Sequence, residues 1–385
     1  MMNIIQDKIR GCLMGGAVGD ALGYPIEFMR GRSIVKQYGE KGITEYELDR
    51  ETGKAVISDD TQMTMFTANG LLLADTRAAL EEQTAWPPRK EIARAYQDWL
   101  VTQELSYEDF ERRPKADLRG GSSWLLDVPE LFELRAPGNT CLFALRCLKN
   151  GGDRKEDYIR EPQNSSKGCG GVMRVAPMGL SDRLPIEAMD FEGAQLAAVT
   201  HGHSLGYMPA AVLTHIVHRL VFGEKDFSLK EIVLEAKETA EKVFAGDKHL
   251  EEHSALIMKA VELSENGEGD LSNIRALGEG WVADEALAIA LYCALRHQDD
   301  FSAGIIASVN HSGDSDSTGA IAGNILGALH GFEAIEEKWK KDLELVDEII
   351  ELSDDLFRLC QCNERRPFRD PDWIGKYGSR LRPIE

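Results

Sequence analysis

Two short acidic clusters, far apart in the sequence, constrain this 385-residue chain more than any other feature. They are Ser58-Asp59-Asp60-Thr61 and Asp314-Ser315-Asp316-Ser317-Thr318-Gly319, and each opens an apolar, small-residue-rich stretch typical of a buried helix. Four carboxylates converging at the ends of core helices would repel one another strongly unless cations lay between them. Their oxygen ligands favour Mg²⁺, Mn²⁺ or Ca²⁺ over zinc or copper. The sequence therefore predicts a divalent metal centre assembled from both halves of the chain.

Helical periodicity dominates the rest of the sequence, and runs of alternating β-branched residues are nearly absent, so we expect an all-α protein. Besides the stretch after Asp60, which is apolar on all sides, helices are predicted at 89–103, 191–200, 208–222, 229–244, 255–265, 283–297, 317–331 and 343–359. Two less regular stretches, 107–139 and 150–167, are expected to fold over the core and shape a cleft.

An N-terminal helix, from Ile9 onward, carries Gly15, Gly19 and Gly23 at intervals of four residues. Glycines at this spacing lie along one helix face and allow another backbone to approach closely. Tight helix packing is the interpretation that we favour for this row.

Composition and charge limit the classes of partner. The formal net charge of -21 argues against a surface that follows a phosphate backbone, so nucleic acid is not an expected partner. A small anionic ligand stays compatible, because metals or backbone amides can reverse the sign locally. We see no apolar run long enough to span a bilayer and no signal peptide at the N-terminus. The seven cysteines form no Cys-x-x-Cys pair and predict reduced thiols in a cytoplasmic protein.

Each acidic cluster has a plainer interpretation. Ser58 or Asp59 could simply cap a helix, although two adjacent acids exceed what a cap needs. The second cluster starts like a calcium-binding EF-hand loop, but the twelfth position, which must supply a bidentate acid, is Ile325. The calcium-loop interpretation therefore fails. What is left is a glycine-flanked turn that presents Asp314, Asp316 and a hydroxyl at the start of a helix.

Two further segments carry candidate binding residues. Gly168, Gly170 and Gly171 lie in a loop that could point several amides at a phosphate, although a tight turn is the commoner explanation. The loop matches neither a P-loop nor the dinucleotide fingerprint. Downstream, His201 could donate to a ribose hydroxyl or orient a metal ligand, whereas His203 is interpreted as an ordinary hydrogen-bonded histidine.

In this order, these segments resemble the ADP-ribosylglycohydrolase family, of the type that includes the dinitrogenase reductase-activating glycohydrolase and the ADP-ribosylarginine hydrolases. The matching segments are Gly19-Asp20-Ala21-Leu22-Gly23 with Glu27, the two acidic clusters, the glycine loop with Met173-Arg174-Val175-Ala176-Pro177, and Thr200-His201 with Ser204-Leu205-Gly206-Tyr207. Segments 135–140 and 280–283 are similar as well. The resemblance spans residues 10 to 331, and the two acidic motifs together are its most specific part.

The resemblance implies one domain over residues 1–385, an all-α orthogonal helical bundle with two Mg²⁺ ions, or Mn²⁺, in a central cleft. Carried over by motif, the implied metal ligands are Ser58, Asp59, Asp60, Asp314, Asp316 and Ser317. Glu27 matches an acid beside the metals, the three loop glycines match a segment that wraps a diphosphate, and His201 matches a residue near the ribose. Serine stands at 58 and 317 where the family often has threonine, and both residues keep the hydroxyl.

The function implied is hydrolysis of the glycosidic bond between ADP-ribose and a modified protein side chain, with arginine as the first choice. The form of the second acidic motif is similar to the arginine-linked branch, whereas the His201 segment is more similar to the serine-linked branch. Asp60, Asp316 and Glu27 are the candidates for the general base. The alternatives are a hydrolase of serine-linked or small-molecule ADP-ribosyl compounds and a non-catalytic ADP-ribose-binding relative. Neither nucleic acid nor membrane is expected as a partner.

Overall fold

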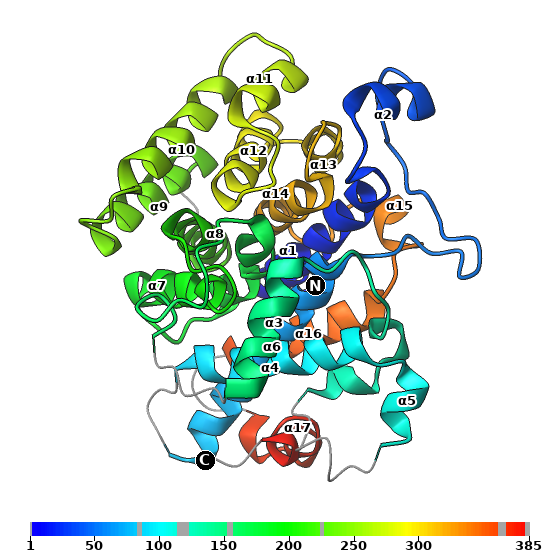
Figure 1. Ribbon diagram of the computed structural model, residues 1–385, viewed down its shortest axis with the longest axis vertical. Helices are drawn as coiled ribbons and strands as arrows, with labels where there is room; N and C mark the ends of the chain where they lie inside the picture. Colours follow the sequence, from blue (N-terminus) through cyan, green and yellow to red (C-terminus); the bar gives the residue numbers. More distant parts are fainter. Residues whose placement is uncertain are drawn as a thin grey trace.

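The computed structural model describes residues 2–82, 87–113, 123–151, 157–223, 227–360 and 367–381, and these residues fold into helices (Figure 1). The α-helices are α1 (Ile4–Gly23), α2 (Gly31–Tyr38), α3 (Asp59–Leu80), α4 (Pro88–Glu104), α5 (Tyr107–Glu111), α6 (Asn139–Gly151), α7 (Ile186–Ala198), α8 (Ser204–Phe222), α9 (Leu229–Val243), α10 (Leu250–Ser264), α11 (Asp270–Leu277), α12 (Ala283–Arg296), α13 (Phe301–Val309), α14 (Ser315–His330), α15 (Glu337–Lys340), α16 (Val346–Cys360) and α17 (Pro371–Lys376). Short 3₁₀ helices are η1 (Tyr24–Ile26), η2 (Trp124–Asp127), η3 (Pro129–Leu131), η4 (Cys169–Arg174), η5 (Ala176–Leu180), η6 (Pro367–Arg369) and η7 (Gly378–Arg380).

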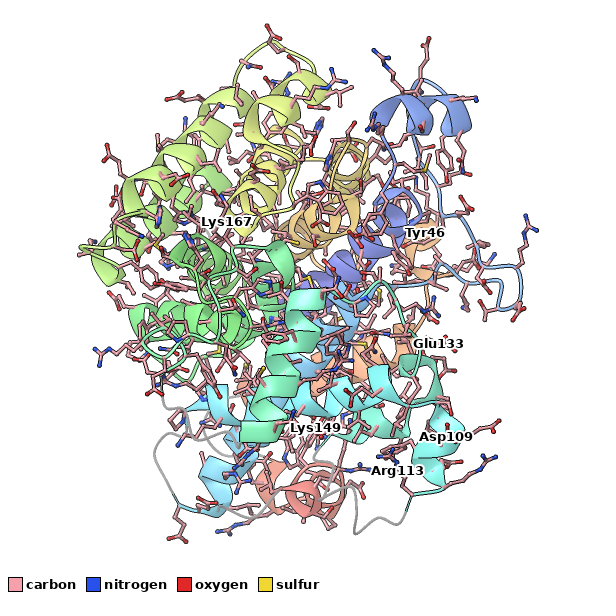
Figure 2. All side chains as sticks on the ribbon, in the orientation of Figure 1. Tyr46, Asp109, Arg113, Glu133, Lys149 and Lys167 are labelled. Carbon is pink, nitrogen blue, oxygen red and sulfur yellow. The ribbon has the colours of Figure 1, made fainter. Side chains whose placement is uncertain are left out.

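The all-α prediction is confirmed. Within the described ranges, extended pairing is limited to two isolated bridges, one between Ala55 and Leu343 and one between Gly168 and Val282. Figure 1 shows α1, α8 and α14 inside the arrangement, with α2, α5 and α17 at its edges. Side chains fill the space between the ribbons in Figure 2, where Asp109 and Arg113 project from the edge near α5.

The glycine row of α1 packs against a matching row on α14. The two helices run antiparallel, with Gly11 opposite Gly327, Gly15 opposite Gly323 and Gly19 opposite Gly319. A Cβ atom added to Gly19 would lie 1.9 Å from the carbonyl oxygen of Gly319, which no side chain can tolerate. The prediction of tight helix packing is therefore confirmed, and the second row on α14 is a feature that the sequence reasoning missed.

This register also determines which helix ends meet. The end of α1 lies beside the start of α14, because a Cβ atom on Gly23 would meet the carbonyl oxygen of Ser315 at 2.4 Å. The chain leaves α1 through η1, so Glu27 emerges next to the acidic turn that opens α14. Antiparallel packing of two glycine rows thus brings residues from the two ends of the sequence to one place.

The predicted helices are present, with ends that differ by a few residues, and the helix after Asp60 is buried along most of its length as expected. Seven α-helices in the described ranges were not predicted, namely α2, α5, α6, α11, α13, α15 and α17. The stretch 107–139, expected to be irregular, contains α5, η2 and η3, and its residues 114–122 lie outside the described part of the chain. The six cysteines in the described ranges are free thiols, as predicted, and Cys362 lies outside those ranges.

One expectation about apolar segments was wrong. The length and composition of α8 would allow it to cross a membrane, although no such run was predicted. In this fold, 83% of its most apolar window is buried inside the protein, as in the core helix of a globular protein. Pro209 lies inside this helix as its sixth residue, where it removes the amide that would otherwise donate to the carbonyl oxygen of Leu205.

Candidate metal centre

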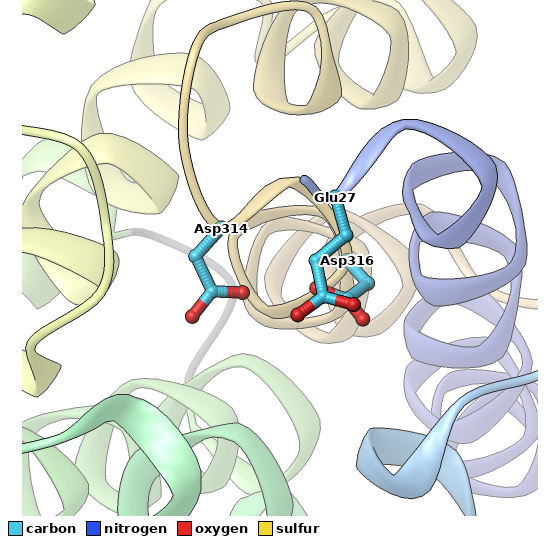
Figure 3. Close-up of side chains that lie close together, drawn as sticks. All are labelled: Glu27, Asp314 and Asp316. Carbon is cyan, nitrogen blue, oxygen red and sulfur yellow. The ribbon is translucent and has the colours of Figure 1, made fainter. Parts of the chain in front are cut away.

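The turn that opens α14 presents two buried carboxylates. Asp314 is the N-cap of the helix, where its side chain accepts a hydrogen bond from the Ser317 amide at 3.3 Å. The same amide donates to Oδ1 of Asp316 at 2.9 Å. One carboxylate oxygen from each of Glu27, Asp314 and Asp316 lies within 4.8 Å of the other two. Figure 3 shows the three carboxylates directed toward the same space.

The start of α3 contributes the other predicted acids. Ser58 is the N-cap, and its hydroxyl accepts a hydrogen bond from the Asp60 amide at 3.1 Å, so the capping interpretation of this residue is correct. Capping does not use the two carboxylates. Oδ2 of Asp59 accepts from the Gly138 amide at 3.2 Å, and Oδ1 of the buried Asp60 has no hydrogen-bond partner among the described residues.

The electrostatics link the two acidic motifs. Burial raises the pKa of Asp60 well above its usual range, with further contributions from Asp20, Asp59 and Asp314, while a hydrogen bond with Ser317 acts in the opposite direction. Burial likewise raises the pKa of Asp316, followed by the charges of Asp60 and Asp314. The structure therefore brings the predicted acids from both motifs into one buried group, with Glu27 inside it.

Asp20 orients the start of α3, a role that the sequence reasoning did not assign. Its fully buried carboxylate accepts hydrogen bonds from the Ser58 amide at 3.0 Å and from the Thr61 amide at 3.0 Å, and also from the Thr61 hydroxyl. Burial raises the pKa of Asp20 to about 6, and the hydrogen bonds from Ser58 and Thr61 act against that rise. The available signal was that Asp20 is the one charged residue in the apolar, glycine-rich stretch from Gly11 to Gly23.

The residues present fit a hard divalent cation. Within the described part of the chain, none of Glu27, Asp59, Asp60, Asp314 and Asp316 forms an ion pair with lysine, arginine or histidine. Glu27 Oε2 and Asp60 Oδ1 are buried without a hydrogen-bond partner. Buried carboxylates without compensation are costly, and oxygen donors of this kind suit Mg²⁺ or Mn²⁺.

A thiol also lies next to these acids. The sulfur atom of Cys169 approaches Oδ2 of Asp314 at 2.7 Å, a contact that was not predicted from the sequence.

The glycine loop and His201 also come together. A Cβ atom on Gly168 would lie 3.2 Å from Nε2 of His201, and one on Gly170 would lie 3.0 Å from Cε1. A Cβ atom on Gly171 would meet Cβ of Ala197 at 2.9 Å, so close packing explains that glycine. Gly170 and Gly171 are part of η4, and the two predicted binding features therefore lie side by side.

A buried arginine, Arg174, is linked to His201 through Thr200. The guanidinium of Arg174 donates to the Thr200 hydroxyl at 2.6 Å, and that hydroxyl lies 2.9 Å from Nδ1 of His201. Arg174 also packs over the ring of Tyr96, 4.3 Å from its centroid. Burial, together with the charge of Arg174, lowers the pKa of His201 to about 3. The imidazole is therefore neutral at pH 7 and can hydrogen-bond to a polar ligand.

Comparison with known proteins identifies the family. The model of the family described as ADP-ribosylglycohydrolase matches residues 1–366. The chain belongs to the ADP-ribosylglycohydrolase family. Members of this family release ADP-ribose from modified substrates by hydrolysis. This protein is therefore an enzyme of the ADP-ribosylglycohydrolase class.

Relatives match over nearly the whole chain. The ADP-ribosyl-[dinitrogen reductase] glycohydrolase of Rhodospirillum rubrum is 26% identical over 344 residues, covering 89% of this chain and 92% of the relative. The ADP-ribosylhydrolase ARH3 of Danio rerio is 28% identical over 395 residues, covering 96% and 95%. A solved ADP-ribosylglycohydrolase-related protein complex superposes with a TM-score of 0.62 at 23% identity, covering 94% of this chain and all of that one. This ADP-ribosylglycohydrolase therefore has the fold of its family.

Proposed function

We propose that the protein hydrolyses the bond between ADP-ribose and a modified arginine side chain in a reaction that depends on Mg²⁺. The observation that carries this proposal is the convergence of Glu27 and the aspartates of both acidic motifs in one buried group without a cationic partner. Such a group is unstable by itself and is typical of a functional site. Family membership supplies the reaction class.

The residues proposed to hold the metals are Ser58, Asp59, Asp60, Asp314, Asp316 and Ser317, with Glu27 beside them. Two Mg²⁺ ions, or Mn²⁺, would supply charge stabilisation and a lowered pKa for a reacting water. The hydroxyl of Ser58 and the amide of Ser317 are engaged in capping their helices, which fixes the side chains around them.

The protein's own groups narrow the choice of general base. Oδ1 of Asp316 accepts a hydrogen bond from the Ser317 amide, whereas Glu27 Oε2 and Asp60 Oδ1 accept none within the described ranges. A base needs a free lone pair directed at the proton that it accepts. Glu27 and Asp60 are therefore the better candidates. Of these two, Glu27 lies next to the exposed Phe28, so it is the one closer to the solvent side of the site.

The glycine loop and His201 would hold the part of the substrate that does not react. Amides of a glycine-rich turn can bind phosphate oxygens, and a neutral imidazole can bind a hydroxyl. Binding energy from this remote part positions the reacting carbon against the water. The contacts among Arg174, Thr200 and His201 keep that imidazole in place without a charge of its own.

The acidic character of the site supports arginine as the acceptor. Glu27 lies beside the proposed metal ligands without being one of them, so its carboxylate can attract a positively charged guanidinium more strongly than a neutral serine hydroxyl. The relative from Rhodospirillum rubrum is named for ADP-ribosyl-dinitrogen reductase. Arginine is accordingly the acceptor that we would test first.

A release assay tests the proposal. Purified protein is incubated with arginine-linked and serine-linked ADP-ribosyl proteins and with small ADP-ribosyl compounds, in Mg²⁺ and in chelator, and free ADP-ribose is measured. We expect release from the arginine-linked protein in Mg²⁺ and at least about a hundredfold less in chelator. Preference for the serine-linked protein would refute the arginine assignment. Binding of ADP-ribose without any release would show a non-catalytic relative.

Metal removal should make stability depend on pH in a defined direction. Burial, followed by the charges of Asp314 and Asp59, raises the pKa of Glu27 to about 8, and burial also raises the pKa of Asp59 to about 8. Unfolded carboxyls titrate near ~4. Between these values the folded state binds more protons than the unfolded state, so this contribution to stability falls as pH rises from about 4 to about 8.

Thermal unfolding in chelator and in Mg²⁺, measured across that pH range, checks this expectation. Mg²⁺ binds ionised carboxylates, so the increase in Tm that it causes should grow toward pH ~8. An Mg²⁺ effect that is equal at both ends of the range would contradict the assignment of these acids as ligands. Glu231, an exposed carboxylate that caps α9, offers a control position where Glu231→Gln should leave the Mg²⁺ effect unchanged.

A further inference from the structure

Two large aromatic side chains are exposed and stacked on each other. Phe28 is 74% exposed and Trp281 is 39% exposed, although 253 positions separate them in the sequence (281 minus 28). Their ring centroids lie 5.8 Å apart and their planes differ by 16°. Single exposed aromatics are ordinary, but two that meet from distant segments form a defined apolar surface.

Both residues belong to segments that build the acidic site. Phe28 directly follows Glu27, and Trp281 directly follows Gly280. Gly280 has a positive φ of 83°, and a Cβ atom there would lie 2.9 Å from Cγ2 of Thr318 and 3.4 Å from Cβ of Asp314. The segment of Trp281 therefore rests on the turn that opens α14.

The same segment is fastened to the glycine loop. The Cys169 amide donates to the carbonyl oxygen of Trp281 at 3.3 Å, and the Ala283 amide donates to the carbonyl oxygen of Lys167 at 2.9 Å. Lys167 is exposed, and its label in Figure 2 lies within the outline of the molecule in this view. The aromatic pair is thus held by backbone contacts between the loop proposed to bind ADP-ribose and the acids proposed to act on it.

We propose that Phe28 and Trp281 form the acceptor subsite, where the guanidinium of the modified arginine packs on the exposed surface of the stacked rings. This inference rests on the proposed function, and it names the residues that bind the modified side chain of the substrate. A guanidinium is planar, delocalised and weakly hydrated, so it stacks on aromatic rings better than an ammonium or a hydroxyl does. The neighbouring carboxylate of Glu27, which is not one of the proposed metal ligands, adds attraction for the same positive charge.

The stacking geometry assigns different parts to the two rings. At a centroid separation of 5.8 Å the rings already touch, so a guanidinium binds on an outer face of the pair and not between the rings. Because Phe28 is the more exposed ring, it offers the larger free face, and Trp281 holds it in position while adding its own edge. Both residues are therefore specificity-determining, and neither is placed to exchange a proton.

Variants of each ring test the subsite against the reaction itself. Phe28→Ala and Trp281→Ala should each raise KM for ADP-ribosyl-agmatine about tenfold, the loss expected of one cation–aromatic contact in a partly desolvated site. Their Kd for free ADP-ribose, which lacks the acceptor, should stay within about twofold of the wild-type value. Phe28→Tyr and Trp281→Phe, which keep a ring, should recover most of the loss. Unchanged Tm values show that the variants are folded.

A binding measurement and a matched control make the test independent of turnover. Agmatine should compete with ADP-ribosyl-agmatine in the wild-type protein, the analogue that carries a neutral urea group in place of the guanidinium should not, and both alanine variants should lose the competition by agmatine. Phe227 is a suitable control, since it is 45% exposed and packs against Arg219 between α8 and α9. Phe227→Ala should leave every one of these values unchanged.

The outcomes separate the two proposals. If wild-type protein releases ADP-ribose from ADP-ribosyl-agmatine but the alanine variants keep the wild-type KM and agmatine competition, the subsite is refuted and the reaction stands. If wild-type protein binds ADP-ribosyl-agmatine without releasing ADP-ribose, and agmatine competes for that binding only when both rings are present, the subsite stands and the proposed reaction is refuted. The acceptor assignment would also be refuted if the alanine variants raised the Kd for free ADP-ribose by the same factor as the KM for ADP-ribosyl-agmatine.

Discussion

Replacing Asp316 with asparagine is expected to abolish hydrolysis, by roughly a thousandfold or more, while the fold stays intact. The carboxylate lies within 4.8 Å of those of Glu27 and Asp314, and asparagine removes one of its oxygens and its charge. The same change relieves repulsion in the metal-free protein, because burial and the charges of Asp60 and Asp314 raise the pKa of Asp316. The variant should therefore unfold at an equal or higher temperature than the wild-type protein in chelator, and Mg²⁺ should stabilise it less.

A buried aspartate outside the site provides the matched control. Oδ2 of Asp355 on α16 accepts hydrogen bonds from the ammonium of Lys376 at 2.5 Å and from the hydroxyl of Tyr377 at 2.6 Å. Asp355→Asn should lower stability by about 1–3 kcal/mol, because buried donors lose a charged acceptor, while activity persists. Asp316→Asn should therefore remove activity and keep stability, whereas Asp355→Asn should lower stability and keep activity. Near-wild-type turnover in the Asp316 variant would contradict the metal assignment.

Gly19→Ala is expected to destabilise the protein by about 3 kcal/mol or more, or to prevent folding altogether. Its new methyl group would lie 1.9 Å from the carbonyl oxygen of Gly319 and 2.3 Å from that residue's carbonyl carbon. These are backbone atoms of another core helix, so a side-chain rearrangement cannot relieve the clash. Because α1 and α14 together present Glu27, Asp314 and Asp316, activity should fall together with stability. Chemical unfolding at fixed Mg²⁺ measures the change.

An open glycine shows whether the effect comes from packing. Gly267, in the turn after α10, has no atom within 4 Å of the position that a Cβ would take, and its φ does not favour glycine. Gly267→Ala should be neutral or slightly stabilising, since alanine has less conformational freedom than glycine in the unfolded chain. If both alanine variants proved equally stable, the helix contact would have to be looser than the structure shows.

The helical class and the two acidic motifs could be predicted from the sequence alone. Period-3.6 patterns predicted the long helices because amphipathic or fully apolar stretches of that length have few other ways to bury their surface. These patterns did not predict α6 or α13, because α6 follows a stretch rich in proline and glycine and α13 is short. The acidic motifs were recognisable because adjacent carboxylates at the start of an apolar helix are costly without a function.

How these parts meet follows from the packing of the helices and could not be predicted from the sequence. The antiparallel register of α1 on α14 brings Glu27 beside Asp314, and no local pattern encodes which of several glycines will face each other. The role of Asp20 depends on donors from α3, and the pairing of Phe28 with Trp281 depends on two turns that rest on the same helix start. Residues far apart in a chain become neighbours through packing, and packing is a property of the whole fold.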